Sequence, residues 1–284
     1  MALLQVNVIS DALKRTVPMT VILPVDKLFG GAADSDEQKP FKTLYLLHGL
    51  MGNYTDWTAQ TNIQALATEK NLAVVMPSGD NSFYVDSPIP NNNYGTFIGE
   101  ELIHITRRMF PLSHRREDTF IAGFSMGGFG ALRNGLKYSD TFGYIAALSS
   151  ALNIFELPAD QPGRCLFYED GCFGDLEEAR KTDKNPRVAL ENLSAAAVSY
   201  PSVNLPKVYM ACGLQDGLIG VNRVFRDLLK EKGMDLTYEE TEGMHNWAFW
   251  NSQLPKVLEW LPLDTGSLGL DSGHVQISSG GIAE

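Results

Sequence analysis

The chain has 284 residues, of which 44% are hydrophobic, so it can bury a substantial core, and a fibrous or wholly disordered protein is excluded. Asp and Glu number 34 against 23 Lys and Arg, giving a formal net charge of −11. Because this charge repels phosphate backbones and anionic lipid, and the basic residues form no run, we expect neither nucleic acid nor a membrane surface as a partner.

The cysteines and the N-terminus bear on the compartment. Three cysteines are an odd number in a chain too large to depend on disulfides, which favours a reducing compartment. The first residues lack the positive start and apolar run of a signal peptide. No apolar segment approaches the length of about 20 residues that crosses a bilayer. We therefore expect a cytoplasmic protein.

The predicted elements alternate between strands and helices. Two early segments surround a polar turn, as in an antiparallel hairpin, and short apolar runs then alternate with segments of helical period. Such alternation predicts an α/β fold with a mostly parallel sheet and helices on both faces. In chain order, we expect the hairpin strands at 3–9 and 16–23, further strands at 42–47, 72–76, 119–122, 143–148, 208–211 and 236–240, the last at a sheet edge, and helices at 58–70, 97–110, 127–137, 218–232 and 246–261.

Two segments depart from the alternation. Residues 151–206 form a long insertion, with a helix expected at 186–199; it passes over the carboxyl ends of the strands, where open α/β folds bind ligands, and is a candidate lid. Residues 263–284 are rich in Gly and Ser and form either a loosely ordered tail or an arm that docks on a neighbouring subunit of a homo-oligomer. We therefore predict one domain over 1–262.

The segment Gly123-Phe124-Ser125-Met126-Gly127 runs from an apolar strand into a helix. A serine on so sharp a turn has a strained backbone, and glycines two positions before and after it avoid collisions. The turn lifts the hydroxyl to the positive end of the following helix. Gly-x-Ser-x-Gly arises by accident in a chain with 26 glycines, so its placement between strand and helix is the stronger indication that Ser125 is a nucleophile.

A serine hydroxyl needs a base to take its proton and a carboxylate to orient that base. In this architecture the chain order is Ser, then Asp or Glu, then His. Two histidines follow Ser125: His274 lies in the tail, whereas His245 lies between the last strand and the last helix and is the predicted base. Asp216 follows a buried strand and a glycine turn and is the predicted acid, although it could also cap the next helix.

Acyl transfer also needs donors for the negative charge that develops on the carbonyl oxygen. We expect one donor to be the backbone amide of Met126, directly after the nucleophile. The second is expected from Leu50, in the glycine-bracketed loop 46–53 that follows an early core strand. His48 in this loop is interpreted as a brace that hydrogen-bonds the loop, and not as a base.

Three aromatic residues are candidates for substrate binding. Tyr84 and Trp247 lie in loops at the expected mouth of the site, and Phe124 directly precedes the nucleophile. Together with Leu50 and Met126, these bulky side chains indicate a tight apolar acyl site, which favours acetyl to butyryl groups over long chains.

The site motifs together resemble the esterase D-like family of α/β-hydrolases, which includes S-formylglutathione hydrolases, feruloyl and acetyl esterases, and tributyrin esterases. The resemblance runs from the hairpin to about Pro262, and the tributyrin esterases are the most similar branch, through residues 75–84 and 243–247. The motifs are Leu46-Leu-His-Gly-Leu-Met-Gly-Asn53, Phe120-Ile-Ala-Gly-Phe-Ser-Met-Gly-Gly-Phe-Gly-Ala131, Cys212-Gly-x-x-Asp216 and His245-x-Trp247.

This resemblance implies an α/β-hydrolase fold and hydrolysis of short-chain acyl esters without a metal or cofactor. It assigns the nucleophile, acid, base and oxyanion amides to the same five residues as the motif analysis. We therefore expect a serine carboxylesterase that acts on a small-molecule acyl ester.

Other functions stay open. Formylglutathione hydrolases carry histidines where this chain has Phe124 and Phe129, which disfavours a glutathione thioester. A carbohydrate acetyl or feruloyl esterase would use the insertion to grip sugar, and an acyltransferase would pass the same acyl group to an alcohol. A non-catalytic binding module is disfavoured because all three members of the triad occur in the required order.

Overall fold

The computed structural model describes residues 1–26, 39–158, 160–162 and 164–263, apart from the side chains of 165–167. The tail from residue 264 onward, with His274 and the proposed docking arm, lies outside the described residues. Within the described part of the chain, no helix combines the length and apolar character that crossing a bilayer requires.

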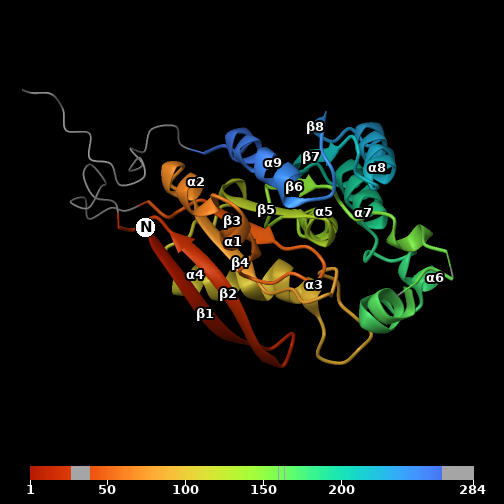
Figure 1. Cartoon of the computed structure of the whole chain (residues 1–284), viewed down its shortest axis with the longest axis horizontal. Helices are drawn as coiled ribbons and strands as arrows, with labels where there is room; N and C mark the ends of the chain where they lie inside the picture. The colour runs from red at the N-terminus through yellow and green to blue at the C-terminus, as the bar shows by residue number, and fades with distance from the viewer. Residues whose placement is uncertain (27–38, 159, 163, 264–284) are drawn as a thin grey trace, which may run out of the picture.

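The described strands form one eight-stranded sheet in the order β1-β2-β4-β3-β5-β6-β7-β8. The hairpin strands β1 and β2 pair antiparallel at one edge, β2 pairs antiparallel with β4, and all later neighbours are parallel up to β8 at the other edge (Figure 1). The bounds are β1 (Ala2–Ser10), β2 (Arg15–Leu23), β3 (Thr43–Leu47), β4 (Ala73–Pro77), β5 (Thr119–Phe124), β6 (Tyr144–Leu148), β7 (Lys207–Gly213) and β8 (Leu236–Thr241). The predicted hairpin, parallel order and edge strand are therefore confirmed.

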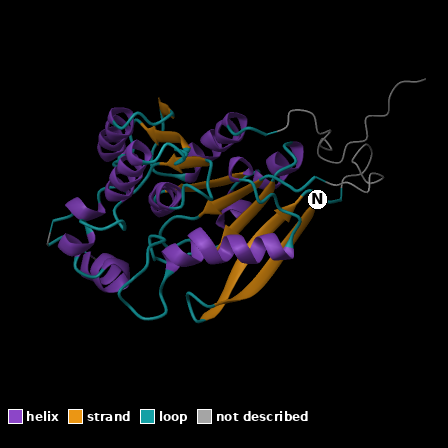
Figure 2. Cartoon of the chain, turned by 180° about the vertical axis from the view of Figure 1, so that it is seen from behind, coloured by secondary structure: helices purple, strands orange, loops and turns teal. Residues whose placement is uncertain are grey.

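Helices cover both faces of the sheet, as Figure 2 shows from behind. The helices are α1 (Asp56–Gln60), α2 (Ile63–Glu69), α3 (Tyr94–Thr96), α4 (Leu102–Met109), α5 (Met126–Lys137), α6 (Leu176–Ala179), α7 (Pro186–Ser199), α8 (Ile219–Glu231) and α9 (Trp247–Trp260). Successive side chains of a strand point to opposite faces, so β3 gives Leu44 and Leu46 to a core under α1, α2 and α9, and Tyr45 and Leu47 to a core under α4, α5, α7 and α8.

Two predicted helices differ from the observed ones. The segment 58–70 is two helices, because Thr61 is extended (φ −139°, ψ 170°) between them. Its hydroxyl accepts a hydrogen bond from the amide of Ile63 and donates to the Trp57 carbonyl, and such local side-chain bonds compete with the helix. The segment 97–110 instead begins at Tyr94 and passes through a π-helical turn, Phe97–Glu101, before α4.

The order of the strands positions the site. After β3, the chain adds β4 on one side of it and β5 on the other, so the loops that follow β3 and β5 meet at the carboxyl ends of adjacent strands. This is the switch point at which open α/β sheets bind ligands. The insertion contributes α6 and the predicted helix α7, which packs against α5.

Candidate active site

Ser125 lies in the turn between β5 and α5 in a strained conformation, with φ 55° and ψ −117°. Few residues other than glycine adopt such a backbone, and it recurs at nucleophiles. The flanking glycines are required by space: a Cβ on Gly123 would lie 2.4 Å from the Gly127 carbonyl oxygen, and one on Gly127 would lie 2.5 Å from that of Leu47. The turn and the end of β3 therefore approach as closely as the motif predicts.

The three predicted side chains form one hydrogen-bonded line. His245 Nε2 lies 2.9 Å from Ser125 Oγ, and His245 Nδ1 lies 2.9 Å from Asp216 Oδ2. The Asp216 side chain is fully buried, whereas that of His245 is 36% exposed, so the imidazole joins a buried carboxylate to a hydroxyl that substrate can reach. With the proton on Nδ1 donated to Asp216, Nε2 is free to accept the serine proton.

Asp216 is held as an anion. Burial raises its pKa, but the hydrogen bonds from His245 and from the Leu218 amide outweigh burial and lower the pKa below the ordinary 3.8. The Leu218 N–H donates to Oδ1 at 2.9 Å, just before α8. Asp216 therefore orients the imidazole and accepts a bond from the turn before α8, but it does not cap that helix: Leu218 is the N-cap residue and has no side-chain cap bond.

The loops that carry Asp216 and His245 are tied to each other. The amide of Leu214 donates to the Thr241 carbonyl and that of Gln215 to the Gly243 carbonyl, at 2.9 and 3.0 Å. The Gln215 side chain accepts in return from the Gly243 amide at 2.8 Å. Extra pairing beyond the ends of β7 and β8 thus fixes the distance between acid and base.

The loop after β3 is braced by His48, which is buried. The Gly79 amide donates to its Nε2 at 2.8 Å, so the ring proton is on Nδ1, which donates to the Gly49 carbonyl at 2.7 Å. Burial lowers the pKa of His48 below 6.5, which keeps the ring neutral. The predicted structural role of His48 agrees with these contacts.

This brace orients the candidate oxyanion donor. In a planar trans peptide, C=O and N–H point in opposite directions. Because His48 and the Gly52 amide hold the Gly49 carbonyl, the Leu50 N–H points away from them. Within the described residues, the amides of Leu50 and Met126 donate to no acceptor, and Met126 is the first residue of α5. Both amides can therefore serve a developing oxyanion.

Removing the brace tests this arrangement. We expect His48→Ala to lower kcat about 10- to 100-fold, because losing a whole oxyanion donor costs about 10²- to 10³-fold and the Leu50 amide would only be misplaced. Steady-state kinetics on p-nitrophenyl acetate measure the effect. The exposed His104 on α4 gives the matched control, His104→Ala, with kcat within about 2-fold of wild type. Equal rates for the two variants would contradict the role of the brace.

An aromatic cluster lies beside the triad. Phe124 stacks on Trp250 with centroids 4.1 Å apart and contacts Trp247 edge to face at 4.6 Å. Trp57 packs on Phe124, and the Trp250 ring meets His245 at 90°. Phe124 is only 5% exposed, whereas Trp247 is half-buried, so Trp247 is the candidate that offers a surface to substrate. Trp57 and Trp250 were not among the aromatic candidates that the sequence indicated.

Tyr84 is not at the mouth of the site. It is fully buried, and its hydroxyl donates to the His48 carbonyl at 2.9 Å. Phe83 and Tyr84 both have positive φ, 51° and 57°, which turns this loop inward beneath the oxyanion loop. The expected substrate contact of Tyr84 therefore has no support; the side chain contacts the loop that carries Leu50. Asn81 from the same segment accepts from the Met51 amide at 2.8 Å, a contact without a sequence signal.

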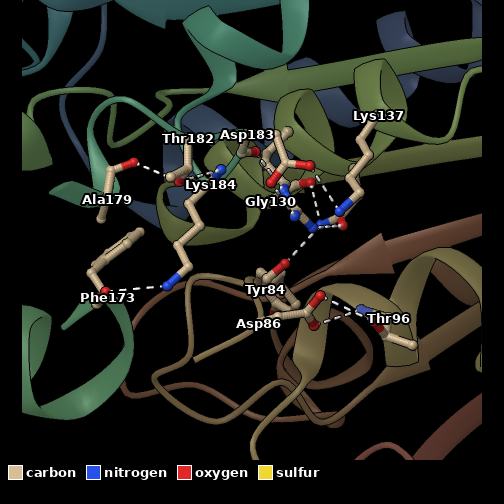
Figure 3. A network of polar contacts seen from close by, with 12 residues as sticks. Tyr84, Asp86, Thr96, Gly130, Lys137, Phe173, Ala179, Thr182, Asp183 and Lys184 are labelled. Carbon is tan, nitrogen blue, oxygen red and sulfur yellow. Dashed lines mark hydrogen bonds and ion pairs between the residues drawn. The ribbon is translucent and has the colours of Figure 1, made fainter. Parts of the chain in front are cut away.

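The insertion is anchored to α5. The buried Arg133 donates to the Asp183 carbonyl at 3.0 Å and to Asn134 Oδ1 at 2.8 Å, and Lys137 pairs with the Asp183 carboxylate at 2.9 Å (Figure 3). The same network reaches Phe173, whose carbonyl accepts from Lys184. This part of the candidate lid is thus fixed to the helix that follows the nucleophile.

The two cations that reach Asp183 differ in burial, with 1% of the Arg133 and 30% of the Lys137 side chain exposed. We expect Arg133→Met to lower the free energy of unfolding by about 3 kcal/mol, because it leaves the buried Asn134 Oδ1 and the half-buried Asp183 carbonyl without their donor. Lys137→Met should cost only about 0–1 kcal/mol, since its ion pair is solvated. Urea denaturation compares the two; similar losses would contradict the anchor.

The fold and the Ser–His–Asp line define a serine hydrolase of the α/β-hydrolase class. A family model described as "Putative esterase" matches residues 10–261, and the chain belongs to this family. It is therefore a serine esterase, a carboxylic ester hydrolase with the α/β-hydrolase fold that the resemblance implies.

Individual relatives agree with this class. The chain is 43% identical over 266 residues to an acetyl esterase of Caldicellulosiruptor saccharolyticus, covering 92% of this chain and 98% of the relative. Its structure is similar to FphF, a fluorophosphonate-binding serine hydrolase of Staphylococcus aureus, with TM-score 0.78, 32% identity and coverage of 92% and 98%. The S-formylglutathione hydrolase FrmB of Staphylococcus aureus gives TM-score 0.76 and 31% identity with the same coverage.

Proposed function

We propose that this esterase hydrolyses short-chain acyl esters through a Ser125–His245–Asp216 triad and an acyl-enzyme intermediate. The observation that carries the proposal is the continuous hydrogen-bonded line from Ser125 Oγ through both ring nitrogens of His245 to the buried Asp216. Each donor and acceptor in this line is in the order that proton transfer from the serine requires.

The chemistry follows from the geometry. Ser125 Oγ attacks the ester carbonyl while His245 Nε2 takes its proton, and the Leu50 and Met126 amides stabilise the oxyanion. The intermediate collapses as the imidazolium gives the proton to the departing alkoxide, leaving an acyl-serine. A water molecule, deprotonated by the same nitrogen, releases the carboxylic acid and restores the serine.

A short acyl group is favoured by the aromatic cluster. Phe124, Trp247 and Trp250 pack on one another beside His245, and we expect these rings to restrict the space open to a long acyl chain. The 43% identity to an acetyl esterase supports the same preference, and so does the resemblance to tributyrin esterases.

A chain-length profile tests this preference. For p-nitrophenyl acetate, butyrate, octanoate and laurate, we expect kcat/KM to be highest at acetate or butyrate and about 10-fold or more lower at octanoate, because a methylene that does not fit costs about 1–3 kcal/mol. Trp247→Ala should raise the octanoate rate relative to acetate. Octanoate or laurate as the best wild-type substrate would refute the short-chain proposal while leaving the triad standing. Acetylated xylo-oligosaccharide and methyl ferulate, assayed beside these esters, test the alternative of a carbohydrate acetyl or feruloyl esterase.

A second candidate activity is hydrolysis of S-formylglutathione, which is favoured by the 31% identity to FrmB. Phe124 and Phe129 argue against it. Both are buried in aromatic contacts, and neither provides the imidazole that formylglutathione hydrolases carry at these positions. Tested beside p-nitrophenyl acetate, S-formylglutathione is expected to have the lower kcat/KM, and the reverse order would make the thioester the better assignment.

A further inference from the structure

We propose that Asn222, on α8, is a positioning residue that holds the segment 149–151 and thereby aligns Ser125 with Asp216. This inference rests on the proposed function of the triad. Asn222 contacts no reacting group itself. It holds residues 149–151. The backbone of this segment bonds Ser125 on one side and Ala211, in the strand that precedes Asp216, on the other.

Asn222 is fully buried and pairs with both backbone groups of one residue. Its Oδ1 accepts from the Ser150 N–H at 3.2 Å, and its Nδ2 donates to the Ser150 carbonyl at 2.9 Å. These are the bonds that a neighbouring strand would supply, but Ser150 lies beyond the end of β6. Since buried backbone groups must be paired, a single carboxamide fixes this segment where the sheet no longer does.

The end of β6 and the segment after it hold the strained nucleophile from both sides. The Ser125 amide donates to the Leu148 carbonyl at 2.9 Å, and the Ser125 carbonyl accepts from the Ala151 amide at 3.1 Å. A backbone at φ 55° persists only when its surroundings fix it. Movement of residues 149–151 would therefore move the Ser125 peptide groups and, with them, the hydroxyl.

The same segment and Asn222 also reach the acid. Ser149 has φ 46°, an uncommon conformation for serine, and its amide donates to the Ala211 carbonyl of β7 at 2.8 Å. In addition, Asn222 Nδ2 donates to the Leu218 carbonyl at 2.9 Å, and the Leu218 amide donates to the Asp216 carboxylate. Asn222 is thus connected to Ser125 through Ser150 and Ala151, and to Asp216 through Leu218.

Gln253 on α9 provides a matched control. It too is a buried carboxamide, 1% exposed, and it bonds two side chains, accepting from the Tyr209 hydroxyl and donating to Thr241. These contacts lie in β7 and β8 and do not involve the triad or residues 149–151; at Thr241 the partner is the hydroxyl and not the carbonyl that pairs with the Leu214 amide. Asn222→Ala and Gln253→Ala therefore both remove a buried amide with its bonds, but only the first should disturb the triad.

The test compares kcat, KM and the rate of labelling by a fluorophosphonate in both variants, on folded protein and well below each Tm. We expect Asn222→Ala to lower kcat and the labelling rate about 10- to 100-fold with KM within about 3-fold, because misplacement of reacting groups affects the chemical step. Gln253→Ala should lower Tm comparably and keep kcat within about 3-fold.

Equal kcat values for Asn222→Ala and wild type would overturn the inference, and so would an equal loss in Gln253→Ala. If Asn222→Ala does not fold, Asn222→Asp serves in its place: it keeps the shape and the acceptor for the Ser150 amide but loses the donor, and it too should lower kcat at unchanged KM. A wild-type protein without esterase activity would refute the proposed function instead, so the two failures are distinguishable.

Discussion

Replacing Ser125 by alanine is expected to lower kcat/KM for p-nitrophenyl acetate by about 10⁵-fold or more, since the nucleophile of a serine hydrolase has no substitute. The folded structure should persist, because among the described residues the Ser125 side chain bonds only His245, and the strained turn is held by backbone bonds. Hydrolysis rates and the thermal midpoint, measured on one preparation, give both quantities.

The control for Ser125→Ala is Ser199→Ala. Ser199 ends α7, and its hydroxyl donates to the Ala195 carbonyl one turn back. Activity within about 2-fold of wild type is expected there, as for other surface changes. If Ser125→Ala retained a tenth of the wild-type activity at an unchanged thermal midpoint, the hydrolysis would have to occur at another site.

Asp216→Asn is expected to lower kcat by about 10⁴-fold, the cost of holding the imidazole in the wrong tautomer. The Leu218 amide donates to Oδ1, so the carboxamide oxygen would take that place and its NH₂ group would face His245 Nδ1. Nδ1 must then accept, and the ring proton moves to Nε2. A protonated Nε2 cannot take the serine proton.

The matched change is Asp227→Asn on α8, where the carboxylate is exposed and paired with Arg226. It should alter kcat by less than about 2-fold. Steady-state kinetics on the wild type, Asp216→Asn and Asp227→Asn measure the effect. An Asp216→Asn enzyme as active as Asp227→Asn would show that His245 does not depend on Asp216.

Much of the fold could be predicted because its signals are local. Almost purely apolar runs such as β3 and β5 indicated buried parallel strands. The glycines around Ser125 indicated the turn, since the close approach of Gly127 to Leu47 leaves no room for a side chain. The position of His245 followed from the order of the elements. The prediction of one helix over 58–70 was wrong because Thr61 makes local bonds that periodicity does not detect.

The parts of the site that could not be predicted depend on contacts between distant segments. Tyr84 was expected in a loop at the mouth of the site; two successive residues with positive φ, neither of them glycine, turn it into the core instead. Asn222 lies on the buried side of an ordinary amphipathic helix, and its bonds to Ser150, 72 residues away, have no counterpart in any motif. The bond of Asn81 to the Met51 amide also joins segments distant in the chain, so no motif indicated it.

The most direct test of the triad is the rate and site of reaction with a fluorophosphonate probe. The protein is incubated with the probe, digested, and mapped by mass spectrometry, alongside Asp216→Asn. We predict one phosphonylated residue, Ser125, formed fast in the wild type and at least about 10²-fold more slowly in the variant, because phosphonylation needs the same deprotonated hydroxyl as acyl transfer. Modification of a different serine, or of Ser125 at equal rates in both proteins, would contradict the account.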